Sequence, residues 1–380
     1  MVQKERLKLG LIFNFDPVWM GGSIYLTNSI RIFKFLEDKD MPKIFVFYNP
    51  LLKNFIDEID YPYAEFIPHQ FPRLYKGYIQ SWLKGKNVFV DDLIAEYHLD
   101  AVFPMHEYPV KSKSKAKLVS WYADLQHMRY PEFWSKKKRA GRYAKIRFIL
   151  NNSKDLVLSS QAVKDDFNHF FKMPKSLKVH IYHFVSIIEG LPDVSIEDLR
   201  EKYGLKENYF MISNQFHKHK NHKVVFEAVA MLKKKGIPVN IAITGRFPVA
   251  ENSPYLSQLH DIVNENNLKD QISFLGLIPR GDQLMLMKYS QAIIQPSLFE
   301  GWSTVIEDAR SLQVPVIASS LPVNIEQLQE KGTYFEPFDV ETLANHLVNA
   351  PKRDFGVDLY EPYEDRMKKA AYELLNVFLD

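Results

Sequence analysis

The chain has 380 residues, of which 46% are hydrophobic and 25% charged, a composition that suits a folded protein with two α/β domains. It has no cysteine, which excludes disulfide bonds, thiolate metal sites and a cysteine nucleophile. The charged start MVQKERLKLG lacks the apolar core of a secretory signal, and no apolar run approaches the roughly 18 residues that span a bilayer. We therefore expect a cytoplasmic protein.

The first half of the chain alternates apolar runs with amphipathic runs. Residues 7–15 open as a strand, Gly21 and Gly22 interrupt the loop that follows, and residues 24–36 have helical spacing. Further strands are predicted at residues 44–48, 101–103, 118–122, 156–159 and 179–182. This alternation predicts a parallel sheet covered by helices.

A basic segment lies within this half. Residues 111–147 hold twelve lysines and arginines against two acids, although the net charge of the chain is only +3. Its last part, KKKRAGRYAKIRF (136–148), places Tyr143 and Phe148 with two alanines on one helical face. We interpret it as a solvated helix packed on its own domain, with peripheral contact to an anionic membrane or to a phosphate-bearing acceptor as the alternatives. No nucleic-acid-binding pattern accompanies the charge.

A linker at residues 186–195 ends the first half, because Gly190 and Pro192 interrupt both periodicities. After it, strands are predicted at residues 209–213, 239–244, 271–275, 292–295 and 314–318, with helices between them. The helix at 221–235 is predicted to be capped by Asn221 and stopped by Gly236. Two such α/β units place a ligand between the domains, at the carboxyl ends of both sheets.

The most informative motif is AIIQPSLFEGWSTVIEDARSLQVPVIAS, residues 292–319. It predicts a buried strand, a tight loop with Glu300 and Gly301, a short helix and a second buried strand. The first amides of such a helix favour a phosphate group, and acidic side chains accept hydrogen bonds from sugar hydroxyls. The motif therefore suits a sugar nucleotide.

This motif resembles the donor-binding motif of family 4 glycosyltransferases, in which seven residues separate two acids. Here that spacing pairs Glu300 with Asp308. Thr304 and Glu307 fit a capping box, which gives Glu307 a structural task and leaves Asp308 for the ligand. The resemblance implies the GT-B fold, with two Rossmann-like domains facing each other across a cleft, retention of anomeric configuration and no required metal.

The resemblance also implies roles for individual residues. Glu300 contacts the transferred sugar, Asp308 accepts from the ribose hydroxyls, and Lys220 grips the diphosphate, so that Glu300, Lys220 and His127 are the candidate catalytic residues. The other candidate donor-binding residues are Gly21, Gly22, Gln215, Lys218, Arg246, Gly301, Trp302, Ser303 and Thr304. For the two N-terminal glycines the alternative is a plain turn, and for His127 it is a histidine satisfied within its loop.

Gln215 departs from the family pattern, which has an arginine at this position. A neutral amide lacks the charge and the two-pronged grip of a guanidinium, so either Lys218 or Arg246 compensates or the diphosphate is held more weakly. Three histidines lie in the same loop, at positions 217, 219 and 222. No nearby acid or cysteine completes a metal-ligand spacing, and we predict no metal.

These observations predict three segments: residues 1–188 as an acceptor-binding domain, 189–358 as a nucleotide-sugar-binding domain, and 359–380 as a helix that crosses back to the first domain. The expected function is transfer of a hexose from a nucleoside-diphosphate sugar to a glycan or lipid-linked acceptor, in surface polysaccharide or glycoconjugate synthesis, without a cofactor. The alternatives are a sugar-nucleotide epimerase, a phosphorylase, or a catalytically silent binder. The basic segment adds the inner membrane face as a peripheral partner.

Overall fold

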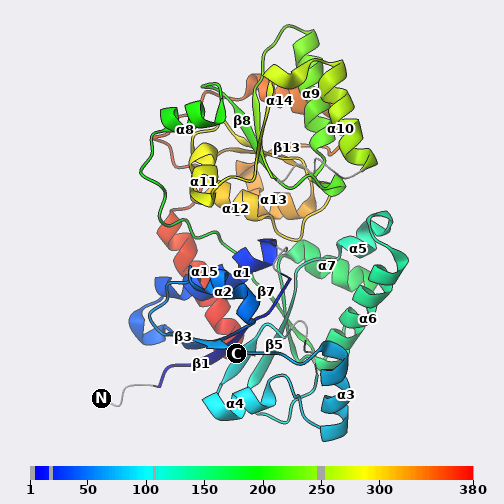
Figure 1. The fold of residues 1–380 in the computed structure, drawn as a ribbon, viewed down its shortest axis with the longest axis vertical. Coiled ribbons are helices and arrows are strands. Elements are labelled where there is room, and N and C mark those ends of the chain that lie inside the picture. Colours follow the sequence, from blue (N-terminus) through cyan, green and yellow to red (C-terminus); the bar gives the residue numbers. More distant parts are fainter. Residues whose placement is uncertain (1–4, 17–19, 106–107, 109, 246–252, 380) are drawn as a thin grey trace. The chain divides into compact units, whose positions relative to one another are not determined.

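The computed structural model describes residues 5–16, 20–105, 108, 110–245 and 253–379, and the chain divides into two compact units (Figure 1). Unit 1 comprises Met1–Val185 and Glu364–Asp380, and unit 2 comprises Ser186–Tyr363. Each unit is built on its own parallel sheet. Among the described residues, each helix is too short or too polar to span a lipid bilayer.

The sheet of unit 1 has seven strands. They are β1 (Lys8–Phe13), β2 (Lys43–Tyr48), β3 (Ala64–Pro68), β4 (Ala101–Phe103), β5 (Lys117–Tyr122), β6 (Asp155–Leu158) and β7 (Lys178–Ile181). Their order in the sheet is β3-β2-β1-β4-β5-β6-β7, and all neighbours pair in parallel. The order reverses between β1 and β4, which is the switch point of a doubly wound sheet.

Helices connect these strands. They are α1 (Met20–Arg31), α2 (Lys53–Ile56), α3 (Leu74–Lys84), α4 (Asp91–Tyr97), α5 (Gln126–Arg129), α6 (Lys136–Asn152), α7 (Gln161–Phe170) and α15 (Tyr363–Leu379), with 3-10 turns η1 (Ile32–Phe35), η2 (Asp38–Asp40), η3 (Pro50–Leu52) and η4 (Pro131–Phe133). Helix α15 comes after unit 2 in the chain, yet it packs within unit 1. Its Phe378 ring lies 5.8 Å from that of Phe103, and its Tyr372 hydroxyl donates to Asp40 at 3.2 Å.

The sheet of unit 2 has six strands. They are β8 (Phe210–Ser213), β9 (Ile241–Thr244), β10 (Ile272–Gly276), β11 (Ile293–Gln295), β12 (Val316–Ser319) and β13 (Thr333–Phe335). Their order is β10-β9-β8-β11-β12-β13, again parallel throughout, so this sheet has its switch point between β8 and β11.

Helices cover both faces of this second sheet (Figure 1). They are α8 (Ile196–Tyr203), α9 (His222–Lys234), α10 (Pro254–Glu265), α11 (Arg280–Lys288), α12 (Thr304–Ser311), α13 (Pro322–Leu328) and α14 (Val340–Asn349), with 3-10 turns η5 (Lys218–Lys220), η6 (Leu268–Asp270) and η7 (Gln329–Lys331). The apolar residues of α9, α10 and α14 pack on one face, and those of α8, α11 and α12 on the other. The central strands read FMIS, IAIT and VIAS and are buried at every position, because both faces are covered.

The predicted α/β architecture with two Rossmann-like units is confirmed. Two strands were not predicted. β3 is an edge strand of the unit 1 sheet, is half exposed and ends at Pro68. β13 is an edge strand of the unit 2 sheet and has only three residues. Edge strands need less apolar surface, so their sequence signal is weak.

Two local predictions were wrong. Gly21 and Gly22 lie in the first turn of α1 and not in a loop before it. Asn221 precedes α9, but its backbone is left-handed (φ 53°) and its side chain makes no cap; it donates instead to the carbonyls of Pro296 and Pro337, at 3.1 and 2.7 Å. Gly236 follows the last turn of α9 with φ 73°, as a helix stop requires.

Gly245 follows β9 directly, where the backbone passes close to Asn214, the residue that follows β8. A Cβ atom at this position would lie 2.3 Å from the Asn214 carbonyl oxygen, and φ is +126°. We expect Gly245→Ala to lower the free energy of unfolding by about 2 kcal/mol or more, measured by urea denaturation. Gly204→Ala is the matched control, because Gly204 also has a positive φ (62°) but faces open space, and should cost only about 1 kcal/mol. Equal losses in the two variants would contradict this close approach.

Candidate active site in unit 2

Two strands of unit 2 end side by side where the strand order reverses. β8 and β11 are neighbours, with Met211 opposite Ile293. Asn214 and the loop leading to η5 follow β8, and the loop 296–303 follows β11. The backbone amide of Leu298 donates to the His219 carbonyl at 2.7 Å, which ties the two loops together. Ligands of open α/β sheets bind at such a position.

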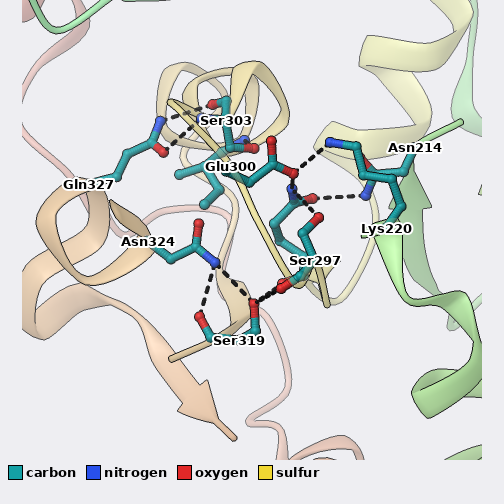
Figure 2. Close-up of polar contacts among 10 residues, drawn as sticks. Asn214, Lys220, Ser297, Glu300, Ser303, Ser319, Asn324 and Gln327 are labelled. Carbon is teal, nitrogen blue, oxygen red and sulfur yellow. Dashed lines mark hydrogen bonds and ion pairs between the residues drawn. The ribbon is translucent and has the colours of Figure 1, made fainter. Parts of the chain in front are cut away.

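An ion pair joins these loops (Figure 2). The Lys220 ammonium lies 2.5 Å from Oε1 of Glu300, and the two side chains are only 18% and 11% exposed. The same carboxylate oxygen accepts from Nε2 of Gln295 at 2.8 Å, and Oε1 of Gln295 accepts from Asn214 at 2.9 Å. The polar ends of β8 and β11 thus form one connected chain of contacts.

Burial and charge act in opposite directions on Glu300. Burial raises the pKa of its carboxyl group, but the nearby Lys220 charge and hydrogen bond, together with a bond from Ser297, bring the pKa below the ordinary value of 4.5. Glu300 is therefore ionised at neutral pH, although it is largely shielded from water.

Ser303 caps helix α12, which begins at Thr304, four residues after Glu300. Its hydroxyl accepts from the Ile306 amide at 3.3 Å, and its amide and carbonyl bond to the side chain of Gln327 at 3.2 and 2.9 Å (Figure 2). The predicted capping box of Thr304 and Glu307 is therefore wrong, because the helix is capped one residue earlier. Glu307 does have a structural task, however, since it pairs with Arg310 at 2.9 Å and accepts from Gln327 at 2.8 Å.

Asp308 lies on α12 and is almost completely buried. Its Oδ1 atom accepts from Arg280 at 2.5 Å and from the Ser186 hydroxyl. Oδ2 has no hydrogen-bond partner within the described part of the chain, and no contact joins Asp308 to Glu300 there. Asp308 is thus held by α11 and by the start of unit 2, not by the switch-point loops.

Further polar contacts fix the loop that carries Glu300. Ser319, at the end of β12, donates to the Ser297 carbonyl at 2.6 Å, and Asn324 donates to the Ser319 carbonyl at 2.9 Å (Figure 2). The Asn221 side chain holds the Pro296 carbonyl from the other side. The position of Glu300 is therefore set by side chains from three different elements.

The other predicted donor-binding residues are distributed as follows. Gln215 is half-buried beside Asn214, Lys218 is exposed in η5, and Gly301, Trp302, Ser303 and Thr304 lead into α12. Arg246 lies outside the described residues. Gly21 and Gly22 belong to α1 of unit 1.

His127 lies on α5 in unit 1 and is completely buried. Neither ring nitrogen has a hydrogen-bond partner among the residues that the structure describes. Burial, with the charges of Arg142 and Arg139, lowers the pKa of His127 to about 4. The ring is therefore neutral at physiological pH and retains one donor and one acceptor for a ligand.

No cluster of three potential metal ligands occurs in residues 5–245 and 253–379, as far as they are described. Of the three histidines near Lys220, His217 and His219 stack on each other, with ring centroids 5.6 Å apart. His222 is buried in α9 and stacks on Phe216 at 4.4 Å. These three rings pack on aromatic neighbours and do not converge on one point.

Sequence reasoning missed three residues of this region: Asn214, Gln295 and Arg280. Asn214 and Gln295 are polar residues at the ends of apolar strand runs, a signal that the sequence does contain. Arg280 opens α11 after Pro279, and nothing in its neighbourhood in the sequence points to Asp308, which lies 28 residues further on.

Comparisons with known proteins support the fold and match part of the chain to a family. Residues 195–374, which include nearly all of unit 2, match the model of the family described as "Glycosyl transferases group 1". The whole chain has the GT-B fold, since solved structures of that fold superimpose on nearly its full length. One is HepE from Anabaena in complex with UDP-glucose, with a TM-score of 0.63 at 17% identity, covering 98% of this chain and 94% of HepE.

Two sequence relatives are glycosyltransferases by name. The O-antigen chain mannosyltransferase RfbU of Salmonella typhimurium is 24% identical over 247 residues, which are 64% of this chain and 63% of RfbU. The UDP-Gal:alpha-D-GlcNAc-diphosphoundecaprenol alpha-1,3-galactosyltransferase of Escherichia coli is 28% identical over 170 residues, which are 43% of this chain and 42% of that enzyme. The chain thus spans less than two thirds of the length of either relative.

We expect Lys220→Met to lower the free energy of unfolding by about 3 kcal/mol at neutral pH, because Glu300 is left buried without its partner. The lowered pKa of Glu300 means that the pair stabilises the fold above the ordinary carboxyl pKa of 4.5 and that this contribution is lost as the pH falls through the lower folded-state value. The difference in the free energy of unfolding between the wild type and Lys220→Met should therefore shrink as the pH is lowered, as measured by denaturant unfolding at several pH values.

The matched control is Lys223→Met. Lys223 pairs with Glu227 at 3.5 Å on the exposed side of α9, and both side chains are 38% exposed. Its removal should cost less than about 0.5 kcal/mol at any pH. A Lys220→Met loss that is small, or that does not depend on pH, would show that the Lys220–Glu300 pair is not a buried ion pair in solution.

Proposed function

We propose that the protein is a glycosyltransferase that moves a hexose from a nucleoside-diphosphate sugar to a glycan or lipid-linked acceptor. The observation that carries this proposal is the Lys220–Glu300 pair at the switch point of unit 2, immediately ahead of the amino end of α12. The cation and the helix amides suit the phosphates of such a donor, including the charge that develops on them as they leave, and the carboxylate suits the sugar hydroxyls.

Lys220 is the proposed partner of the diphosphate. A lysine ammonium has three N–H donors, and within the described chain Lys220 uses them toward Glu300 alone. Its remaining donors, together with the amide of Thr304 in the first turn of α12, are suited to phosphate oxygens. Its charge also stabilises the nucleoside diphosphate as it leaves. Lys218 and the neutral Gln215 lie in the same loop and complete this part of the proposed donor site.

Glu300 is the proposed contact of the transferred sugar. Because Lys220 keeps it ionised, the carboxylate accepts hydrogen bonds from sugar hydroxyls and provides negative charge beside the anomeric centre as positive charge develops there. A metal-independent reaction with retention of configuration, as in family 4, is part of this proposal. The neutral ring of His127 is assigned to a sugar hydroxyl of the donor or the acceptor.

Asp308 is the proposed ribose contact. Arg280 and Ser186 both bond to Oδ1, so that Oδ2 is left to accept from a ribose hydroxyl. The UDP-glucose bound by HepE supports a uridine nucleotide as donor, and the names of the two relatives support a place in polysaccharide synthesis. Unit 1, as the domain without this motif, is assigned to the acceptor, and we propose that the enzyme works in the cytoplasm.

A thermal-shift screen with UDP, GDP, ADP and their sugars tests donor binding. At least one of these ligands should raise the melting temperature of the wild type, because a ligand that binds only the native state stabilises it. Lys220→Met should remove this shift and slow transfer, whereas Lys223→Met should retain both. No stabilisation by any nucleotide would overturn the proposal. Donor binding without transfer or donor hydrolysis would identify a silent binder, and a reaction that needs no acceptor would identify an epimerase.

A comparison of UDP with 2′-deoxy-UDP tests the role of Asp308. Calorimetry should show that Asp308→Asn weakens UDP binding at least about tenfold, since a charge-assisted hydrogen bond is lost. The variant should also lose the preference of the wild type for UDP over the deoxy nucleotide, a change that damage elsewhere does not produce. Asp261→Asn, which alters an exposed carboxylate on α10, is the control and should bind as the wild type does. Unchanged discrimination in Asp308→Asn would remove the ribose assignment.

A further inference from the structure

Helix α3 of unit 1 carries an apolar stripe that faces outward. Tyr75, Ile79, Trp82 and Leu83 follow the i, i+4, i+7, i+8 spacing of one helical face. All four are exposed, and Trp82 and Leu83 reach 81% and 69%. Soluble helices normally turn such a face toward the core, so a contiguous exposed stripe of large side chains indicates a contact surface.

The packing of α3 fixes this orientation. Its inward face is made by Gly77 and Ser81, which are buried. A Cβ atom at Gly77 would lie 2.1 Å from the Phe89 ring, so the helix backbone rests directly on that ring. The Ser81 hydroxyl accepts from the Val88 amide at 3.2 Å. The helix therefore cannot rotate its apolar stripe inward without separating Gly77 from Phe89.

Helix α6 extends this surface. Figure 1 shows α3 and α6 next to one another in unit 1, and the rings of Tyr78 and Phe148 meet at 5.3 Å. Phe148 and Tyr143 are about two fifths exposed, at 41% and 42%, while Ile146 and Ile149 anchor α6 in the core. The two aromatic side chains that the sequence singled out on α6 are thus partly exposed, and Phe148 meets α3 through Tyr78, which lies outside the stripe.

Cations surround the stripe. Lys76 and Lys84 lie on α3 itself, and the ammonium of Lys113 lies beside the end of the helix, 3.6 Å from where a Cβ of Gly85 would be. On α6, Arg147 is exposed next to Phe148, whereas Lys136, Lys137, Lys138 and Arg139 are exposed in the first turn, at the other end of the helix; no ion pair joins these five residues to an acid in the described residues. The nearest acids in sequence are engaged, since Asp92 pairs with Lys86 at 2.6 Å and Asp91 accepts from the Asn87 amide at 2.8 Å.

From this combination we infer that the outward face of α3, with the adjoining part of α6, docks on an anionic lipid bilayer. Aliphatic and aromatic side chains beside an excess of lysine and arginine are the pattern of an interfacial helix, with the apolar side chains in the headgroup region and the cations on lipid phosphates. The positive charge favours this occupant over a second copy of the chain, which would bring the same charge to the contact. The inference does not depend on the chemistry proposed for unit 2.

Cosedimentation of the full chain with vesicles tests the inference. The wild type should bind phosphatidylcholine–phosphatidylglycerol vesicles at least about tenfold more tightly than pure phosphatidylcholine vesicles, and high salt should weaken that binding. The double variant Trp82→Ser/Leu83→Ser should lose about tenfold or more in affinity for the anionic vesicles. The double variant Lys76→Glu/Lys84→Glu should bind anionic vesicles more weakly than the wild type at low salt, and this difference should shrink at high salt, which screens the charges.

Leu51→Ser is the matched control, because Leu51 is 81% exposed, as Trp82 is, but lies on η3 outside the stripe. It should bind vesicles as the wild type does. Unchanged melting temperatures of all the variants establish that the fold is intact. The inference is overturned if anionic vesicles do not bind the wild type, or if the Trp82/Leu83 variant binds them equally well. It is overturned also if sedimentation shows a wild-type dimer that this variant abolishes, because the stripe is then a protein interface.

Discussion

The candidate site depends on a buried ion pair, whose desolvation is unfavourable and must be offset by the way the sheet of unit 2 brings the two charges together. Taking an ammonium and a carboxylate out of water is unfavourable unless the two meet with good geometry. Lys220 and Glu300 are 80 residues apart in sequence, and they meet only because β8 and β11 are neighbours in the sheet. The neighbouring positions of β8 and β11 thus bring the two charges together, and an order that separated these strands would separate the pair.

The surrounding polar side chains also help to hold the Lys220–Glu300 pair in position. Gln295 continues a buried strand, yet its amide bridges Asn214 and Glu300, so that strand end, loop and ion pair are positioned together. Ser319 and Asn324 do the same for the backbone of the loop from the β12 side. Buried polar side chains that bond to one another restrain the loop, and such restraint suits a site that must present its donors before the ligand arrives.

Much of the fold could be predicted from the sequence, because apolar runs such as IAIT and VIAS leave little choice but a buried strand. Glu300 and Lys220 were proposed for a different reason, because their segments resemble motifs of family 4 glycosyltransferases. The cap of α12 was misplaced by one residue, since Ser303 and Thr304 are both good caps and the choice depends on Gln327, which lies on another helix. The partners of Asp308 could not be predicted, because they come from separate elements that only the tertiary structure brings together.

The placement of α15 means that unit 1 is made from two stretches of chain with all of unit 2 inserted between them. During synthesis from the amino end, unit 2 can complete its core while unit 1 still lacks the helix that covers Phe103. The domain that begins first is therefore finished last. Until α15 emerges, the apolar surface that it covers is open to chaperones and to aggregation, whereas unit 2 has already completed its core.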